Sequence, residues 1–144
     1  MKRFTQCISL VLALVLFLSV PVYAAESTMP RASNFFMASS TYLWKVSSTT
    51  FEVWFDIDAV RGMDELGASE IKVQRSSDGV NWTTMYTYTK ELYPHLIAED
   101  TGSHCGYVTY TGSTGYYYRA FVTYYAKDST GTAEAYRYTS SLKL

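Results

Sequence analysis

Hydrophobic and polar side chains alternate along most of the chain after residue 33. The clearest stretch is residues 51–58, where every second residue is apolar and the residues between are acidic or Trp54. A period of two places the apolar side chains on one face of a strand, whereas a helix would scatter them around its circumference. Residues 71–75 alternate in the same way, with Lys72 and Gln74 on the polar face. The pattern therefore predicts β-strands with one face against a core.

Turn signals separate the alternating stretches. Asp78-Gly79 is a strong hairpin signal, because glycine tolerates the positive φ that such turns require. We expect strands over seven ranges: 34–46, 51–58, 71–75, 80–88, 106–110, 116–127 and 132–142. Residues 89–104 are expected to form an irregular crossover, and residues 63–66 at most one helical turn. About seven strands with regularly spaced turns are typical of an all-β sandwich or barrel.

The N-terminal residues have a different pattern. Two basic residues precede an uncharged stretch over residues 4–25. Pro21 breaks this stretch, and Val22 and Ala24 suit the narrow pockets of signal peptidase, so we interpret residues 1–24 as a cleaved secretory signal. The alternative is an uncleaved membrane anchor, because the apolar run is nearly long enough to span a bilayer.

Cleavage changes the composition of the folded protein. The mature chain then has a flexible lead-in over residues 25–33 and one β-sandwich domain over residues 34–144. Its charge becomes −3, with ten basic and thirteen acidic residues, and Cys105 is its single cysteine, so an internal disulfide is excluded. No basic footprint for nucleic acid is visible. We expect a secreted bacterial protein with no membrane segment after cleavage.

Two stretches resemble fibronectin type III and related immunoglobulin-like sandwiches. Residues 115–122, Gly-Tyr-Tyr-Tyr-Arg-Ala-Phe-Val, resemble the sixth strand, and residues 75–82 look like the hairpin between the third and fourth strands. The resemblance implies that Tyr116 is a corner tyrosine whose hydroxyl bonds back to the upstream backbone. Alternate residues after it would point into the core: Tyr118, Ala120, Val122 and Tyr124. The expected fold is thus an antiparallel two-sheet β-sandwich of about seven strands with this topology.

The chain also resembles a family of small secreted Firmicutes proteins of unknown function. The similar pieces are residues 30–33, 63–69 and 124–131. The resemblance extends over nearly the whole chain and implies export and the same fold. It implies no catalytic residues.

Groups that carry chemistry are few and scattered. His95 and His104 lie in the expected crossover, and Cys105 follows His104 directly. Neighbours on an extended chain point to opposite faces, which disfavours a nucleophile pair. These residues with Glu99 also lack the ligand spacing of structural zinc sites.

The acidic residues show no site pattern either. Asp56 and Asp58 share an outward face, and Asp64 and Glu65 follow in the next connection. Oxygen clusters of this kind bind calcium in some proteins, but no calcium-loop pattern is present. A small two-layer domain rarely has the cleft that glycoside hydrolysis needs between two carboxylates. We therefore predict no enzyme, no metal site and no cofactor.

An outward aromatic stripe is the candidate binding site. If Tyr116 points inward, alternate residues after it point to solvent: Tyr117, Arg119, Phe121 and Tyr125. In this topology the third strand neighbours the sixth, so Lys72 and Gln74 lie beside the stripe. Such a face suits sugar rings or a protein partner. The alternative is that aromatic pairs only stabilise a solvated sheet, and the same two interpretations apply to Trp54 on the opposite sheet.

The sequence thus predicts a secreted, non-enzymatic module that interacts with a protein outside the cell or on its surface. A carbohydrate-binding module that uses the same outward aromatics is the first alternative. A small secreted hydrolase is the second, and it would need a pocket near residues 89–104.

Overall fold

The computed structural model describes residues 34–144, so the predicted signal (1–24) and lead-in (25–33) lie outside the described residues. The described chain is all-β apart from one short 3-10 helix, η1. Its elements are β1 (Phe36–Lys45), β2 (Thr50–Ser76), β3 (Thr83–Thr89), η1 (Pro94–Leu96), β4 (Ile97–Thr111), β5 (Tyr117–Asp128), β6 (Gly131–Tyr138) and β7 (Leu142–Lys143). The strands form one seven-stranded sheet with antiparallel pairing. The all-β class and the antiparallel pairing are confirmed.

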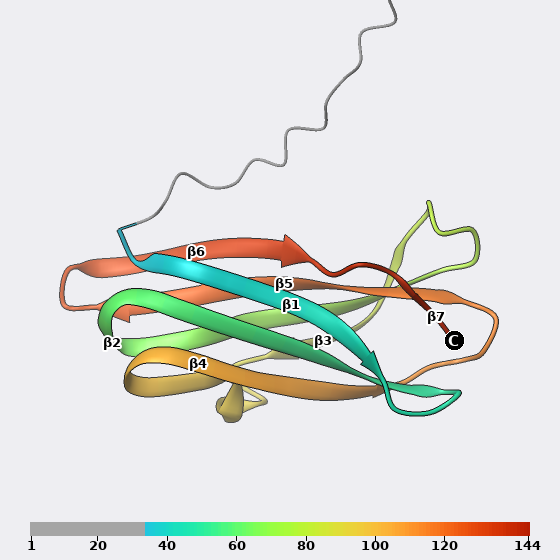
Figure 1. The fold of residues 1–144 in the computed structure, drawn as a ribbon, viewed down its shortest axis with the longest axis horizontal. Helices are drawn as coiled ribbons and strands as arrows, with labels where there is room; N and C mark the ends of the chain where they lie inside the picture. Colours follow the sequence, from blue (N-terminus) through green and yellow to red (C-terminus); the bar gives the residue numbers. More distant parts are fainter. Residues whose placement is uncertain (1–33) are drawn as a thin grey trace, which may run out of the picture.

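β2 organises this sheet. Its first half pairs with β1 along one edge and β4 along the other. Its second half pairs with β3 and β5, and β5 continues the sheet to β6 and β7. The sheet curls where the two halves of β2 meet, at the left of Figure 1. The stretches expected as separate strands over residues 51–58 and 71–75 are therefore parts of one 27-residue strand.

The alternating apolar residues fill the interior of the curl. The predicted inward residues of β2 are all buried: Phe51, Val53, Phe55 and Ile57. So are the predicted inward residues of β5: Tyr118, Ala120, Val122 and Tyr124. The rings of Phe51 and Tyr118 meet across the interior, with centroids 5.2 Å apart. Full burial of an apolar side chain of this size stabilises the fold by about 1.5–3 kcal/mol.

Residues 63–66 form no helical turn, and the expectation that they lie in a connection between strands is wrong. They lie within β2, and Met63 and Leu66 are buried. Leu66 pairs with β4 on one side and β5 on the other, so the sheet outweighs the helical preference of the Met-Asp-Glu-Leu segment. Gly67 allows this crowding, since a Cβ built on it would lie 2.0 Å from the carbonyl oxygen of Leu96.

The expected irregular crossover over residues 89–104 is also largely wrong. Only its first part is irregular, because β4 begins at Ile97 and continues to Thr111. In this 15-residue strand only Val108 is buried. β4 pairs with β2 alone and lies at an edge of the sheet (Figure 1), and the rest of its residues are exposed or only partly buried. A strand with a single buried residue has no set of alternating apolar positions by which the sequence could reveal it.

The predicted hairpin at Asp78-Gly79 is present. β2 and β3 pair antiparallel on either side of it, and Gly79 has a φ of 76°. One carboxylate oxygen of Asp78 accepts hydrogen bonds from the backbone N–H groups of Val80 and Asn81, each at 2.8 Å. These bonds hold the pKa of Asp78 well below its ordinary value, and the bond from the Asn81 N–H has the largest effect.

The hydroxyl that bonds back to the upstream backbone belongs to Tyr118 and not to Tyr116, so the role expected for Tyr116 is wrong. The Tyr118 hydroxyl accepts a hydrogen bond from the N–H of Ser113 at 2.8 Å. It also donates a hydrogen bond to the Ser113 carbonyl oxygen at 3.2 Å. Gly112 leaves room for it, because a Cβ there would lie 2.7 Å from the Tyr118 hydroxyl. Tyr116 is only partly buried and packs against the outside of the core cluster.

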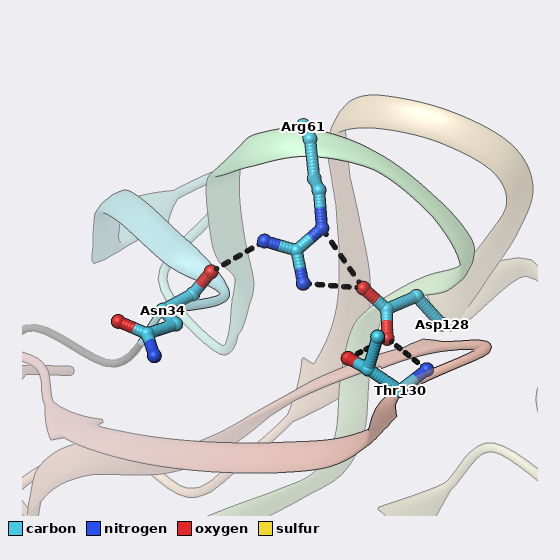
Figure 2. Close-up of polar contacts among 4 residues, drawn as sticks. All are labelled: Asn34, Arg61, Asp128 and Thr130. Atoms are coloured by element: carbon cyan, nitrogen blue, oxygen red, sulfur yellow. Dashed lines mark hydrogen bonds and ion pairs between the residues drawn. The ribbon is translucent and has the colours of Figure 1, made fainter.

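Polar contacts hold the curled end of the sheet together (Figure 2). Arg61, where β2 bends, donates from Nε and Nη2 to one carboxylate oxygen of Asp128, at 2.9 and 2.6 Å. Its Nη1 donates to the backbone oxygen of Asn34 at 3.0 Å. The other Asp128 oxygen accepts from the hydroxyl and the N–H of Thr130 in the β5–β6 turn. Thr130 and then Arg61 lower the pKa of Asp128 to about 2.

Candidate binding surfaces

The structure brings the predicted outward residues onto one outer face of β2 and β5. Phe121 pairs with Lys72, and Arg119 pairs with Gln74. The four β5 residues are neither buried nor fully exposed: Tyr117, Arg119, Phe121 and Tyr125. β6 extends the same face, because Tyr138 pairs with Phe121.

Arg119 lies at the centre of an aromatic cluster on this face. Its guanidinium lies 4.4 Å from the ring centroid of Trp82 and 4.4 Å from that of Tyr138. Its Nε donates a 2.8 Å hydrogen bond to Oε1 of Gln74, which fixes the plane of the guanidinium. We call the outer patch the following residues: Lys72, Gln74, Trp82, Arg119, Phe121, Tyr136 and Tyr138.

Phe121 forms the apolar part of the outer patch. Its ring centroid is 4.8 Å from that of Tyr138 and 5.7 Å from that of Tyr136, at interplanar angles of 52° and 34°. The rings are tilted and so form no flat platform for a row of sugar units. Lys72 lies at the margin, where its Nζ is 6.0 Å from the Phe121 centroid and 2.7 Å from a carboxylate oxygen of Glu70.

Tyr117 and Tyr125 lie at opposite ends of the face, outside the cluster. The ammonium group of Lys143 is 5.0 Å from the Tyr117 centroid, and that of Lys90 is 3.9 Å from the Tyr125 centroid. Each tyrosine ring therefore already has a cationic neighbour.

Sequence reasoning missed three members of the outer patch: Trp82, Tyr136 and Tyr138. The tyrosines had a usable signal, because they alternate within the last long expected strand, over residues 132–142. Trp82 had none, because its place beside Arg119 depends on how the β2–β3 turn folds back.

A second aromatic row crosses the outer face of β1, β2 and β4. Trp54 pairs with Tyr42 on one side and Tyr107 on the other. Its ring lies parallel to that of Tyr42, with centroids 6.2 Å apart, and stacks on that of Tyr107 at 4.6 Å. Its Nε1 donates to a carboxylate oxygen of Glu52 at 2.7 Å. Trp54 therefore has an aromatic partner on each side, an arrangement that stabilises the sheet.

A groove of about 740 Å³ opens between β3 and β4. We call it the tyrosine groove, and its lining consists of Tyr86, Tyr88, Tyr93, His95 and the β4 residues Cys105, Gly106, Tyr107, Val108, Thr109, Tyr110 and Thr111. The Tyr88 hydroxyl crosses from β3 to donate to the carbonyl oxygen of Thr109 at 2.8 Å. Burial raises the pKa of Tyr88 to about 12.

Two candidate catalytic residues, His95 and Cys105, line the tyrosine groove. Nε2 of His95 contacts the carbonyl oxygen of Tyr107 at 3.4 Å, and Nε2 of His104 contacts the carbonyl oxygen of His95 at 3.1 Å. Cys105 is a free, exposed cysteine, and within residues 34–144 it has no hydrogen bond to either histidine. Each histidine thus has its Nε2 in contact with a backbone oxygen.

The acidic residues weighed for calcium are not gathered into a site. Glu65 forms ion pairs with Lys127 at 2.9 Å and Lys90 at 3.3 Å, and the Lys127 bond is the main cause of its lowered pKa. In the described part of the chain, no group of three or more His, Cys, Asp or Glu side chains is placed to hold a metal ion. Nor does any helix described there have the length and apolar character to cross a membrane.

Comparison with known proteins adds no relative. No family model matches the chain, no curated protein matches it, and no solved structure matches it.

Proposed function

We propose that this protein is a secreted, non-enzymatic binding module whose outer patch binds a protein partner. The observation that carries the proposal is the guanidinium of Arg119, held between two aromatic rings on a partly exposed sheet face. Arginine, tryptophan and tyrosine are the residue types that dominate the binding energy of protein interfaces.

The chemistry of Arg119 indicates what the partner presents. Within the described residues only its Nε donates a hydrogen bond, so both Nη groups remain available. With Nε bonded to Gln74, the edge formed by the two Nη groups is free to recognise a carboxylate bidentately, and stacking against the rings orders the guanidinium before binding. The partner then places an Asp or Glu against Arg119 and apolar side chains against Phe121 and Tyr138.

The fold and location belong to the same proposal. The hairpin at Asp78-Gly79 and the buried alternation of β5 support a two-sheet, fibronectin type III or immunoglobulin-like architecture. The continuous 27-residue β2 departs from that pattern, in which separate strands are expected. The apolar N-terminal stretch supports export, and with it a place among small secreted Firmicutes proteins.

The non-enzymatic assignment rests on the tyrosine groove. His95 and His104 are engaged with backbone oxygens, and Cys105 has no histidine bonded to it in the described chain. Acyl transfer by a cysteine needs a base within hydrogen-bond reach of the thiol.

Site-specific photo-crosslinking of the mature protein tests the proposal. A photoreactive phenylalanine replaces Tyr138 in the outer patch. In the matched control it replaces Tyr42, because the two side chains are similarly exposed, Tyr138 at 54% and Tyr42 at 49%. The proteins are added to cells and medium of the producing organism. We expect one partner protein to crosslink at position 138 and not at position 42. This crosslink should disappear when the Arg119→Gln substitution is added. Equal crosslinking at both positions would rule out the outer patch as the binding face.

A further inference from the structure

The tyrosine groove is a second surface with its own chemistry, apart from the outer patch. None of its lining residues is Asp, Glu, Lys or Arg. A charged ligand would therefore lose water there without gaining a counter-charge. The lining instead combines aromatic rings with hydroxyl groups of tyrosine and threonine. Such a surface complements a neutral ligand that has both apolar faces and many hydroxyls.

Three tyrosines give one wall of this groove a fixed shape. The Tyr88 ring is buried and meets the rings of Tyr86 and Tyr93 edge to face, at centroid distances of 4.7 and 4.9 Å. The hydroxyls of Tyr86 and Tyr93 are 2.8 Å apart, so one donates to the other. The accepting hydroxyl keeps its own proton, and both oxygens keep a lone pair. The pair thus offers one donor and acceptors to a ligand hydroxyl.

Strand β4 contributes an exposed tyrosine to the lining. Tyr107 lines the groove, is 45% exposed and is supported by its stacking on Trp54. Groove volumes of about 300–1,000 Å³ are usual for small-molecule sites, and the 740 Å³ found here lies in that range.

An added peptide strand is a poorer occupant of the groove. Strand addition needs free backbone groups along the edge of β4. The carbonyl oxygens of Tyr107 and Thr109 already accept bonds from His95 and Tyr88 across the groove. A peptide would have to displace these side chains, including the buried Tyr88.

We propose that the tyrosine groove binds a neutral oligosaccharide of hexopyranose units. A sugar ring packs its C–H face on Tyr107, and its hydroxyls bond to the Tyr86–Tyr93 pair. This site is independent of the protein-binding role of the outer patch, and the two share no residue.

Isothermal titration calorimetry of the mature protein tests the site. The probes are four neutral sugars, cello-, malto-, laminari- and chitotetraose, with tetragalacturonate as the acidic control. We expect at least one neutral probe to bind and the acidic one not to. Tyr86→Phe removes one hydroxyl of the pair and keeps the ring, and it should weaken binding about five-fold. Tyr107→Ala should weaken it about ten-fold.

Matched variants separate a binding role from a structural one. Tyr42 stacks on the other side of Trp54 from Tyr107 and does not line the groove. Tyr42→Ala should therefore leave the sugar affinity unchanged. Arg119→Gln in the outer patch should also leave it unchanged. The groove proposal is overturned if no neutral probe binds, if tetragalacturonate binds as well as the neutral sugars, or if Tyr42→Ala and Tyr107→Ala weaken binding equally.

Discussion

Gly67 is the position where a single methyl group should disturb the fold most directly. It lies in β2 between β4 and β5, where it pairs with Ile97 and Tyr125. A Cβ at this position would lie 2.0 Å from the Leu96 carbonyl oxygen and 3.0 Å from the Ile97 Cα, so backbone must shift to admit it. Gly67→Ala therefore tests whether β2 passes through the middle of the sheet as one strand.

The size of the effect follows from the contact. Overpacking of an interior costs about 1–3 kcal/mol, and a clash with backbone lies at the upper end, so we expect a loss of about 2–3 kcal/mol. At about 4 °C per kcal/mol for a domain of this size, the melting temperature should fall by about 8–12 °C.

Gly62→Ala is the matched control, because it lies in the same strand with nothing within 4 Å of the added Cβ. It should be neutral or stabilising by up to about 1 kcal/mol, since alanine restricts the unfolded chain. Urea unfolding followed by tryptophan fluorescence and thermal melts give both values. Equal stabilities for the two variants would refute the packing described around Gly67.

The remaining predictions concern the polar contacts of the fold. Tyr118→Phe removes the hydroxyl that bonds to Ser113 and should cost about 1–3 kcal/mol in urea unfolding, whereas Tyr116→Phe should cost little; the reverse order would contradict the Tyr118–Ser113 contact. Asp128 has its pKa lowered to about 2 from 3.8, so its contribution to stability is present above about pH 3.8 and is lost as the pH falls towards 2. Thr130→Ala should raise the Asp128 pKa measured by NMR, and an unchanged value would contradict the contact of Figure 2. Tyr88, with its pKa raised to about 12, contributes stability below pH 10 that is lost as the pH rises from about 10 to 12; in Tyr88→Phe this part of the alkaline stability loss should disappear.

The alternation of apolar residues predicted the parts of the fold that face the core. In β5 every residue expected inside is buried, and in β2 the same holds for residues 51–57. One face of each of these strands packs against the core, and that face is apolar. Pattern and structure agree there because burial itself selects the residues.

The same signal fails where burial is weak or packing is long-range. β4 is an edge strand with one buried residue, so nothing in residues 97–105 distinguishes it from a loop. The joining of two expected strands into β2 depends on pairing with both β4 and β5 around Leu66, which local propensity does not encode.

The sequence predicts only part of the candidate binding surfaces, for the same reason. The neighbours Lys72 and Gln74 follow from strand order, and the structure places them beside Phe121 and Arg119. The place of Trp82 over Arg119 depends on the fold of a turn, and the tyrosine groove depends on β3, η1 and β4 meeting. Neither arrangement has a period or a spacing that the sequence displays.

The most direct measurement takes the partner protein that crosslinks at position 138. It compares the Kd of this partner for the unchanged protein with its Kd for the Arg119→Lys variant. Lysine keeps the positive charge but loses the planar, ring-stacked guanidinium and its paired donors. The matched control is Arg137→Lys on β6, whose Nε donates to Ser39 Oγ at 2.8 Å on the other side of the strand. The outer-patch account predicts at least a ten-fold weaker Kd for Arg119→Lys and an unchanged Kd for Arg137→Lys. An unchanged Kd for Arg119→Lys would contradict it.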